Sequence, residues 1–138
     1  EEINASSNEL SLATHLRAKS KLAGALLIHH SLTGSTGETD SLNEAAVIIE
    51  EVLPLAEAEL GQLHPVTLDI RQQQGHLYFH KQDSVRALEL HSQVLDDSRV
   101  LYDPGNIKIA NAATAVAMVE MMSGGKPCEN IFLISSFK

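Results

Sequence analysis

Residues 67–102, with the sequence TLDIRQQQGHLYFHKQDSVRALELHSQVLDDSRVLY, decide the fold of this chain. In this stretch Tyr78 follows Gly75 by three residues, and Ala87 follows Tyr78 by nine. A small residue, an aromatic residue and an alanine at these positions let the surface of one helix fit closely against the next. The sequence therefore predicts two packed helices joined by a short turn.

A similar six-residue segment stands on either side of these two helices. The segments are LGQLHP at residues 60–65 and LYDPGN at residues 101–106, and they are offset by 41 residues. The same offset takes Gly75 to Val116, so a small or apolar residue recurs where two helices would touch. Self-similarity at a fixed period is typical of repeat proteins. We therefore expect the helix pair to be the central member of a repeat.

Five helices are expected along the chain, joined mostly by short turns that make consecutive helices antiparallel neighbours. The expected helices cover, approximately, residues 7–30, 41–60, 65–80, 84–102 and 107–122. Pro54 lies inside the second helix and predicts a kink there. Residues 33–37 are rich in Gly, Ser and Thr and indicate a flexible loop. Residues 128–138 fit either a final helix or an extended segment, because periodicity cannot distinguish the two over so short a run.

Local signals mark several helix ends. Capping boxes of the form Ser-x-x-Glu at residues 6–9 and 41–44 predict the starts of the first and second helices. Gly61 is placed to end the second helix in the left-handed conformation. Asp83 or Ser84 is expected to cap the fourth helix.

Length and composition limit the class of protein. A chain of 138 residues fits one domain, and 43% apolar but only 4% aromatic residues suit packed helices. A net charge of −8 disfavours nucleic acid and anionic membranes as partners and would suit a basic partner. No apolar run is long enough for a transmembrane helix. We expect a cytoplasmic protein. The start Glu1-Glu2-Ile3-Asn4, without Met or a basic segment, favours a fragment or a processed chain.

These features resemble the tetratricopeptide repeat, in particular the longer repeats of the kinesin-light-chain type, whose joint reads Leu-Gly-x-x-His-Pro. The resemblance implies one all-α domain of antiparallel helix pairs, stacked as a short right-handed superhelix. The implied repeats are residues 7–61, residues 65–102, which match best, and residues 106–136. Arg71 stands where the family often has a large apolar residue, and His91 stands in place of Phe or Tyr. The segment 33–40 is an insertion relative to a standard repeat.

The resemblance also implies a function, which is protein–protein interaction by a scaffold or adaptor. In this family the first helix of each pair lines the concave face, where a segment of a partner protein or peptide binds. The implied partner-binding residues are Asp69, Gln72, His76, Phe79 and His80 in the third helix and Ala113, Ala117, Glu120 and Met121 in the fifth. In the first helix the corresponding residues are Lys21, Ile28 and His29. The alternative for each of these three sets of residues is an ordinary solvated helix face.

Two other classes of protein stay open. The chain is also similar to the C-terminal helical domain of SET/MYND lysine methyltransferases, which has a Pro at the place of Pro54. It would then be an accessory domain of a longer enzyme, since none of that family's catalytic or zinc motifs is present. A structural subunit of a large assembly is the third hypothesis. In all three cases we expect no catalytic residues and no cofactor in the chain itself.

Several residues could instead carry chemistry. His76 and His80, four residues apart on a helix, could share one Zn²⁺, but no third ligand stands at a fixed spacing. The seven histidines could make binding sensitive to pH near 6.5. Cys128, the single cysteine, aligns with Ala87 under the 41-residue shift and is expected to be buried and inert. The acidic run from Glu50 to Glu59 is read as a solvated face, with a basic partner as the alternative.

Overall fold

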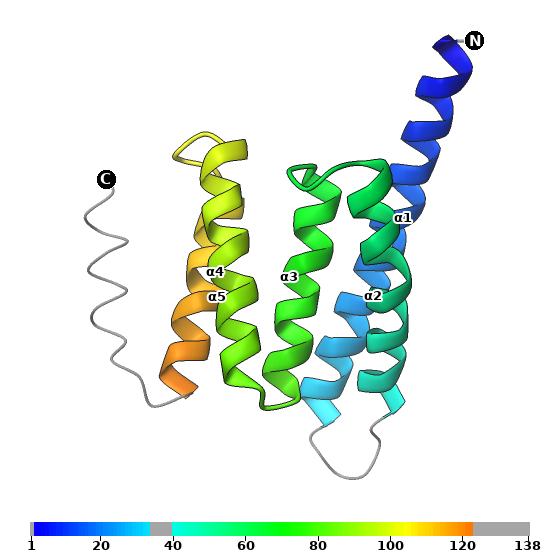
Figure 1. Cartoon of the computed structure of the whole chain (residues 1–138). Helices are drawn as coiled ribbons and strands as arrows, with labels where there is room; N and C mark the ends of the chain where they lie inside the picture. Colours follow the sequence, from blue (N-terminus) through cyan, green and yellow to red (C-terminus); the bar gives the residue numbers. More distant parts are fainter. Residues whose placement is uncertain (1, 34–39, 123–138) are drawn as a thin grey trace.

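The computed structural model describes residues 2–33 and 40–122, and these ranges are helical apart from short connections. The helices are α1 (Glu2–Thr33), α2 (Asp40–Glu59), α3 (Pro65–His80), α4 (Ser84–Leu101) and α5 (Ile107–Met122) (Figure 1). The described residues contain no strand. The expected all-α class is therefore confirmed. None of the described helices is both long enough and apolar enough to cross a membrane.

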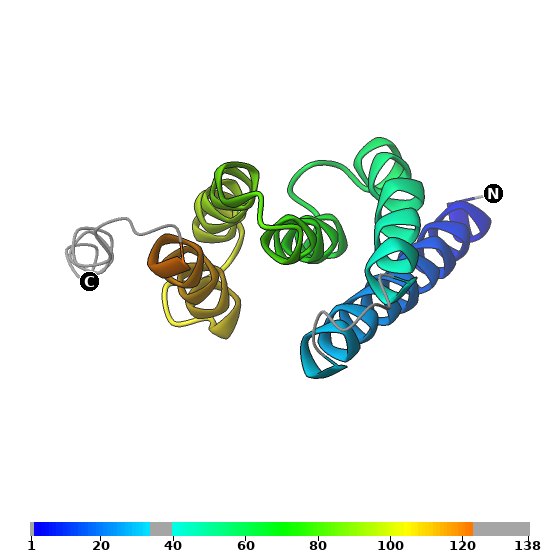
Figure 2. The ribbon, with the colours of Figure 1, turned by 90° about the horizontal axis from the view of Figure 1, so that it is seen from below.

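Consecutive helices run antiparallel and form a staggered row (Figures 1 and 2). α1 packs on α2 and α3, α3 also packs on α2, α4 and α5, and α4 packs on α5. Within the described part of the chain, α2 and α4 do not touch each other. Seen along the helices, α2 and α4 therefore lie on one side of the row, and α1, α3 and α5 form the opposite side (Figure 2).

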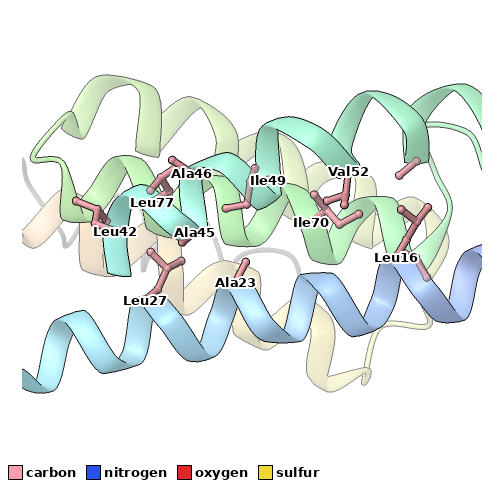
Figure 3. Close-up of a cluster of buried hydrophobic side chains, with 12 residues drawn as sticks. Leu16, Ala23, Leu27, Leu42, Ala45, Ala46, Ile49, Val52, Ile70 and Leu77 are labelled. Carbon is pink, nitrogen blue, oxygen red and sulfur yellow. The ribbon is translucent and has the colours of Figure 1, made fainter. Parts of the chain in front are cut away.

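The larger core cluster joins α1, α2 and α3 (Figure 3). Leu16 of α1, Ile49 of α2 and Ile70 of α3 belong to it and are at most 1% exposed. Alanines such as Ala23 and Ala45, both fully buried, let the helix backbones approach closely. A smaller cluster joins α4 and α5 and comprises Val94, Leu95, Ala112 and Val116.

Several helix ends follow the local signals in the sequence. Gly61 has φ +95°, so α2 is followed by the left-handed residue that was predicted. His64 caps α3, because its Nδ1 accepts a hydrogen bond from the Val66 N–H at 3.1 Å. Asp83 caps α4 by accepting from the Arg86 N–H at 3.2 Å. Asn106 does the same for α5 through the Lys108 N–H at 2.8 Å.

The two predicted capping boxes are wrong. α1 begins at Glu2 and not near residue 7, so Ser6 lies inside the helix. It also runs to Thr33, past the predicted end at His30. Neither Gly nor Pro occurs from residue 2 to residue 23 or from 25 to 33, so local sequence gives no reason to stop earlier. α2 begins at Asp40, one residue before its predicted start, and the Ser41 hydroxyl instead lies 3.0 Å from His29 Nδ1.

α2 continues as a helix through Pro54. The predicted flexible loop lies mostly at residues 34–39, outside the described residues. So do Cys128 and the rest of the segment 128–138.

Gly75 of α3 packs directly against the side chain of His91 in α4. A Cβ atom added to Gly75 would stand 2.5 Å from Cε1, 2.6 Å from Nε2 and 2.8 Å from Nδ1 of His91. His91 is fully buried, and Ala87, one turn earlier in α4, is also fully buried. The small residues of the sequence signature therefore stand where the two helices meet, as expected. The imidazole of His91 fills the space that any side chain at position 75 would need.

Replacement of Gly75 by Ala is expected to destabilise the domain by about 1–2 kcal/mol in urea unfolding. Crowding in a packed core costs about 1–3 kcal/mol, and the better helix propensity of Ala offsets up to about 1 kcal/mol. In a His91→Ala background the crowding is gone, so the same replacement should stabilise by up to about 1 kcal/mol.

Gly24→Ala is the matched control, because its added Cβ would meet only the flexible end of Gln73, at 3.0–3.2 Å. It should be neutral or stabilising. An equal loss of stability from Gly75→Ala with and without His91 would contradict the assigned contact.

Candidate partner-binding groove

A groove of about 440 Å³ opens between α1, α3 and α5. Its lining consists of Arg17, Ser20 and Lys21 of α1, Leu68, Asp69, Gln72, Gln73 and His76 of α3, Val94 of α4, Tyr102, and Lys108, Asn111, Thr114, Ala115 and Met118 of α5. Eleven of these fifteen residues have polar or charged side chains, although apolar atoms supply more of the lining surface. The three helices that supply most of it are the first members of the successive helix pairs.

The structure brings part of the predicted α3 stripe to this groove. Asp69, Gln72 and His76 line it, and so does Lys21 of α1. Phe79 and His80 do not, because they lie at the C-terminal end of α3. There the ring of His80 stands edge-on to Phe79 and to His30, with centroid distances of 5.6 Å and 5.5 Å.

The residues predicted in α5 lie off the groove. α5 borders it with the side that faces α3, and that side carries Asn111, Thr114, Ala115 and Met118. Ala113 instead packs against the α4–α5 core cluster, and Met121 is 66% exposed elsewhere on the helix. Neither Ala117 nor Glu120 lines the groove, and the same holds for Ile28 and His29 of α1.

The structure adds groove residues that the sequence reasoning did not select, chiefly Arg17, Tyr102 and Lys108. One signal was present in the sequence. Arg17 and Lys21 are four residues apart and therefore share one face of α1. No comparable signal places Tyr102, because it belongs to the connection after α4 and reaches the groove only through the packing of α3 and α5.

Charged side chains of α1, α3 and α5 act on the phenol of Tyr102. Burial and the nearby Asp69 carboxylate raise the pKa of this phenol, while the charges of Lys108 and Arg17 oppose the rise. Lys108 Nζ lies 3.2 Å from Asp69 Oδ1. Among the described residues, neither Arg17 nor Lys21 forms an ion pair. The lining therefore holds three cationic side chains and one carboxylate, in a chain whose net charge is −8.

Gln72 and His76 of the groove contact the buried His91 of α4 behind them. The rings of His76 and His91 lie 4.8 Å apart, and Nδ1 of His91 is 3.3 Å from Oε1 of Gln72, a pairing in which the ring nitrogen donates. The pKa of His91 is lowered to about 4, chiefly by burial and also by the charge of His76, against the opposing effect of a hydrogen bond to the Gly75 backbone. His91 is therefore neutral at physiological pH, and its Nε2 is buried without a partner of good geometry.

Arg71 holds α3 in place between its neighbours. It is only 5% exposed, and its guanidinium lies 3.6 Å from a Glu57 oxygen of α2 and 3.2 Å from an Asp97 oxygen of α4. A third contact runs from Nη1 to the Gln62 carbonyl oxygen at 3.4 Å. The departure from an apolar residue at this position is thus explained by a buried arginine that links three helices. A buried charge that loses its partner is strongly destabilising, so these contacts fix the face that α3 turns to the groove.

The domain should lose stability as pH falls from about 6.5 to 4. The pKa of His91 is lower in the folded chain than in the unfolded chain, so the unfolded chain binds this proton first. The free energy of unfolding should therefore be greatest above about pH 6.5. It should fall by up to about 3 kcal/mol as the pH is lowered to about 4. Burial lowers the pKa values of His76 and His80 too, and these groups act in the same direction.

Urea unfolding of the chain and of His91→Gln between pH 7.5 and 4 would measure this dependence. The variant cannot take up the proton and should show a distinctly flatter profile. Parallel profiles for the two chains would refute the assignment of the acid sensitivity to His91.

The described ranges, 2–33 and 40–122, contain no group of three His, Cys, Asp or Glu residues arranged to hold a metal ion. His76 and His80 point to different neighbours, His91 and His30. Comparison of the chain with models of protein families, with curated proteins and with solved structures finds no match. The groove itself is therefore the basis for a functional proposal.

Proposed function

We propose that this chain is a tetratricopeptide-like scaffold domain that binds a segment of a partner protein in the groove between α1, α3 and α5. The observation that carries the proposal is the convergence of polar side chains from three successive first helices on one groove. Helix repeats that leave one face of the stack open commonly use it to bind other proteins. In this proposal the chain binds its partner in the cytoplasm and performs no reaction.

The order in which the helices pack supports the proposal of a tetratricopeptide-like domain. Each first helix packs on its own second helix and on the next first helix, as α1 does on α2 and α3. The joint at residues 60–65 ends α2 with a left-handed glycine and starts α3 with a capped proline. The joint at residues 101–106 again ends one helix and caps the next. A recurring joint of this kind is what a stacked helical repeat requires.

The charge of the groove favours an acidic segment as the occupant. Arg17 and Lys21 are exposed and carry no competing ion pair among the described residues, so a ligand carboxylate can approach both. Lys108, about half exposed, can exchange its contact with Asp69 for one with the ligand. Exposed ion pairs contribute only about 0.2–1 kcal/mol each, so several must act together and the affinity should depend on salt.

The groove also suits an extended backbone. Gln72, Gln73 and Asn111 each offer an amide donor and an acceptor, which can pair with the N–H and C=O groups of a peptide. A volume of about 440 Å³ is within the usual range of ligand sites and admits only a few side chains. We therefore propose a short extended segment with at least two acidic residues.

Selection of a random peptide library against the whole chain tests this proposal. The enriched peptides should be rich in Asp and Glu. The double variant Arg17→Glu/Lys21→Glu should lower the affinity for the best peptide at least 10-fold, as measured by fluorescence anisotropy, because two attractive charges become repulsive. Raising the salt concentration should lower this affinity as well.

Lys81→Glu/Arg86→Glu is the matched control. It changes the net charge by the same amount on residues that do not line the groove, and it should alter the affinity less than 2-fold. Equal effects of the two double variants would show that only overall charge matters. Enrichment of basic peptides would overturn the proposal that the bound segment is negatively charged.

A further inference from the structure

α1 carries a second apolar surface, on the side away from the core. Four of its large apolar side chains are mostly exposed: Leu10 by 71%, Leu22 by 53%, Ile28 by 62% and Leu32 by 81%. Ala18 and Ala25 are exposed as well. These six residues, which we call the α1 stripe, extend over about 33 Å of helix at 1.5 Å per residue.

The spacing of the α1 stripe places it on a single side of the helix. From Leu10 to Leu32 the intervals are eight, four, three, three and four residues, which keep to the helical period. Thr14 lies within the first interval, and its hydroxyl donates to the Leu10 carbonyl oxygen at 2.8 Å. The Thr14 hydroxyl between Leu10 and Ala18 therefore already has a hydrogen-bond acceptor, and Thr14 also carries a methyl group.

The opposite side of α1 is the one buried in the protein. Leu16, Ala23 and Leu27 are at most 3% exposed and pack against α2 and α3. Within the described chain α1 contacts no other helix. A helix that is apolar on both sides is normally covered on both, and exposed apolar side chains that gather on one side of a helix mark an interaction site.

The charges around the stripe specify the occupant. Residues 10–33 contain no Asp or Glu, although the whole chain has 18 such residues and a net charge of −8. Arg17 lies beside the stripe, and Lys21 lies within its arc, between Ile28 and Leu32 around the helix. Both are exposed, whereas Lys19 is held by Glu51 at 2.9 Å. Toward the other side, His29 lies between Ala18 and Leu22 around the helix, and His15 lies just beyond Leu22. A partner with acidic residues beside its own apolar surface complements this arrangement.

A second copy of α1 fits poorly. Arg17 and Lys21 lie close to the middle of the stripe, so a symmetric antiparallel pair would bring four cations together at its centre. A lipid surface is also disfavoured, because the stripe has no aromatic residue and contains two alanines. Those alanines, Ala18 and Ala25, instead allow the backbone of another helix to approach closely.

We propose that the α1 stripe docks an amphipathic helix of a partner protein, whose apolar face is flanked by acidic residues. The apolar residues of the stripe lie outside the groove lining, whereas Arg17 and Lys21 border both surfaces. The proposal does not rest on the groove having a ligand. The domain would then have two binding surfaces: the groove for an extended acidic segment and the α1 stripe for a helix.

Binding of a designed probe to the whole chain tests the proposal. The probe is a 22-residue helical peptide, about the length of the stripe, with leucines at helical spacing and glutamates on both flanks. A second probe carries lysines in place of the glutamates. In anisotropy measurements the acidic probe should bind at least 10-fold more tightly. Leu22→Ser/Ile28→Ser should lower its affinity at least 10-fold.

Val85→Ser/Val100→Ser is the matched control, since these residues are 70% and 73% exposed on α4, and it should change the affinity less than 2-fold. All variants are checked for an unchanged melting temperature. Equal affinity for both probes, or equal effects of both double variants, overturns the proposal. So does self-association in sedimentation that Leu22→Ser/Ile28→Ser abolishes, or tighter binding to phosphatidylserine vesicles than to the acidic probe.

Discussion

The contact between Gly75 and His91 is the constraint on which the rest of the structure depends. It brings α3 and α4 so close that no side chain fits at position 75, and it keeps the imidazole buried and neutral. The same ring holds the amide of Gln72 and lies against His76, two residues of the groove. Arg71, one turn before Gly75, ties α3 to α2 and α4. The helix contact that closes the core therefore also determines which side chains α3 turns toward a ligand.

Charge is distributed unevenly in this domain, and this explains how an acidic chain presents a basic groove. Residues 10–33 of α1 contain only basic charges, and Lys108 adds another at the start of α5. α2 carries a run of glutamates, two of which pair with neighbouring helices, Glu51 with Lys19 and Glu57 with Arg71. A net charge of −8 thus describes the whole chain and not the face that the groove opens on. The acidic surfaces favour solubility, and the basic face would attract an acidic partner and steer its approach.

Much of the fold could be predicted from the sequence, because local signals determine most of it. The left-handed Gly61, the cap Asp83 and the close packing at Gly75 each follow from residue type and spacing. The start of α1 could not be predicted, because a capping box inside a good helical sequence competes with simple continuation of the helix. The groove was predictable on α3 but not on α5. Its position depends on how α5 is rotated against α3, which is a property of tertiary packing that spacing alone does not contain.

Mapping the groove by ¹⁵N–¹H NMR during titration with an acidic peptide tests whether α1, α3 and α5 bind one ligand together. Amide shifts should change in three separate segments, around Arg17–Lys21, Leu68–His76 and Lys108–Met118, with one common binding curve. The phenol of Tyr102 should report the same event, because an added negative charge beside it raises its pKa further. Shifts confined to one segment, or centred on the α2 and α4 side, would contradict the account.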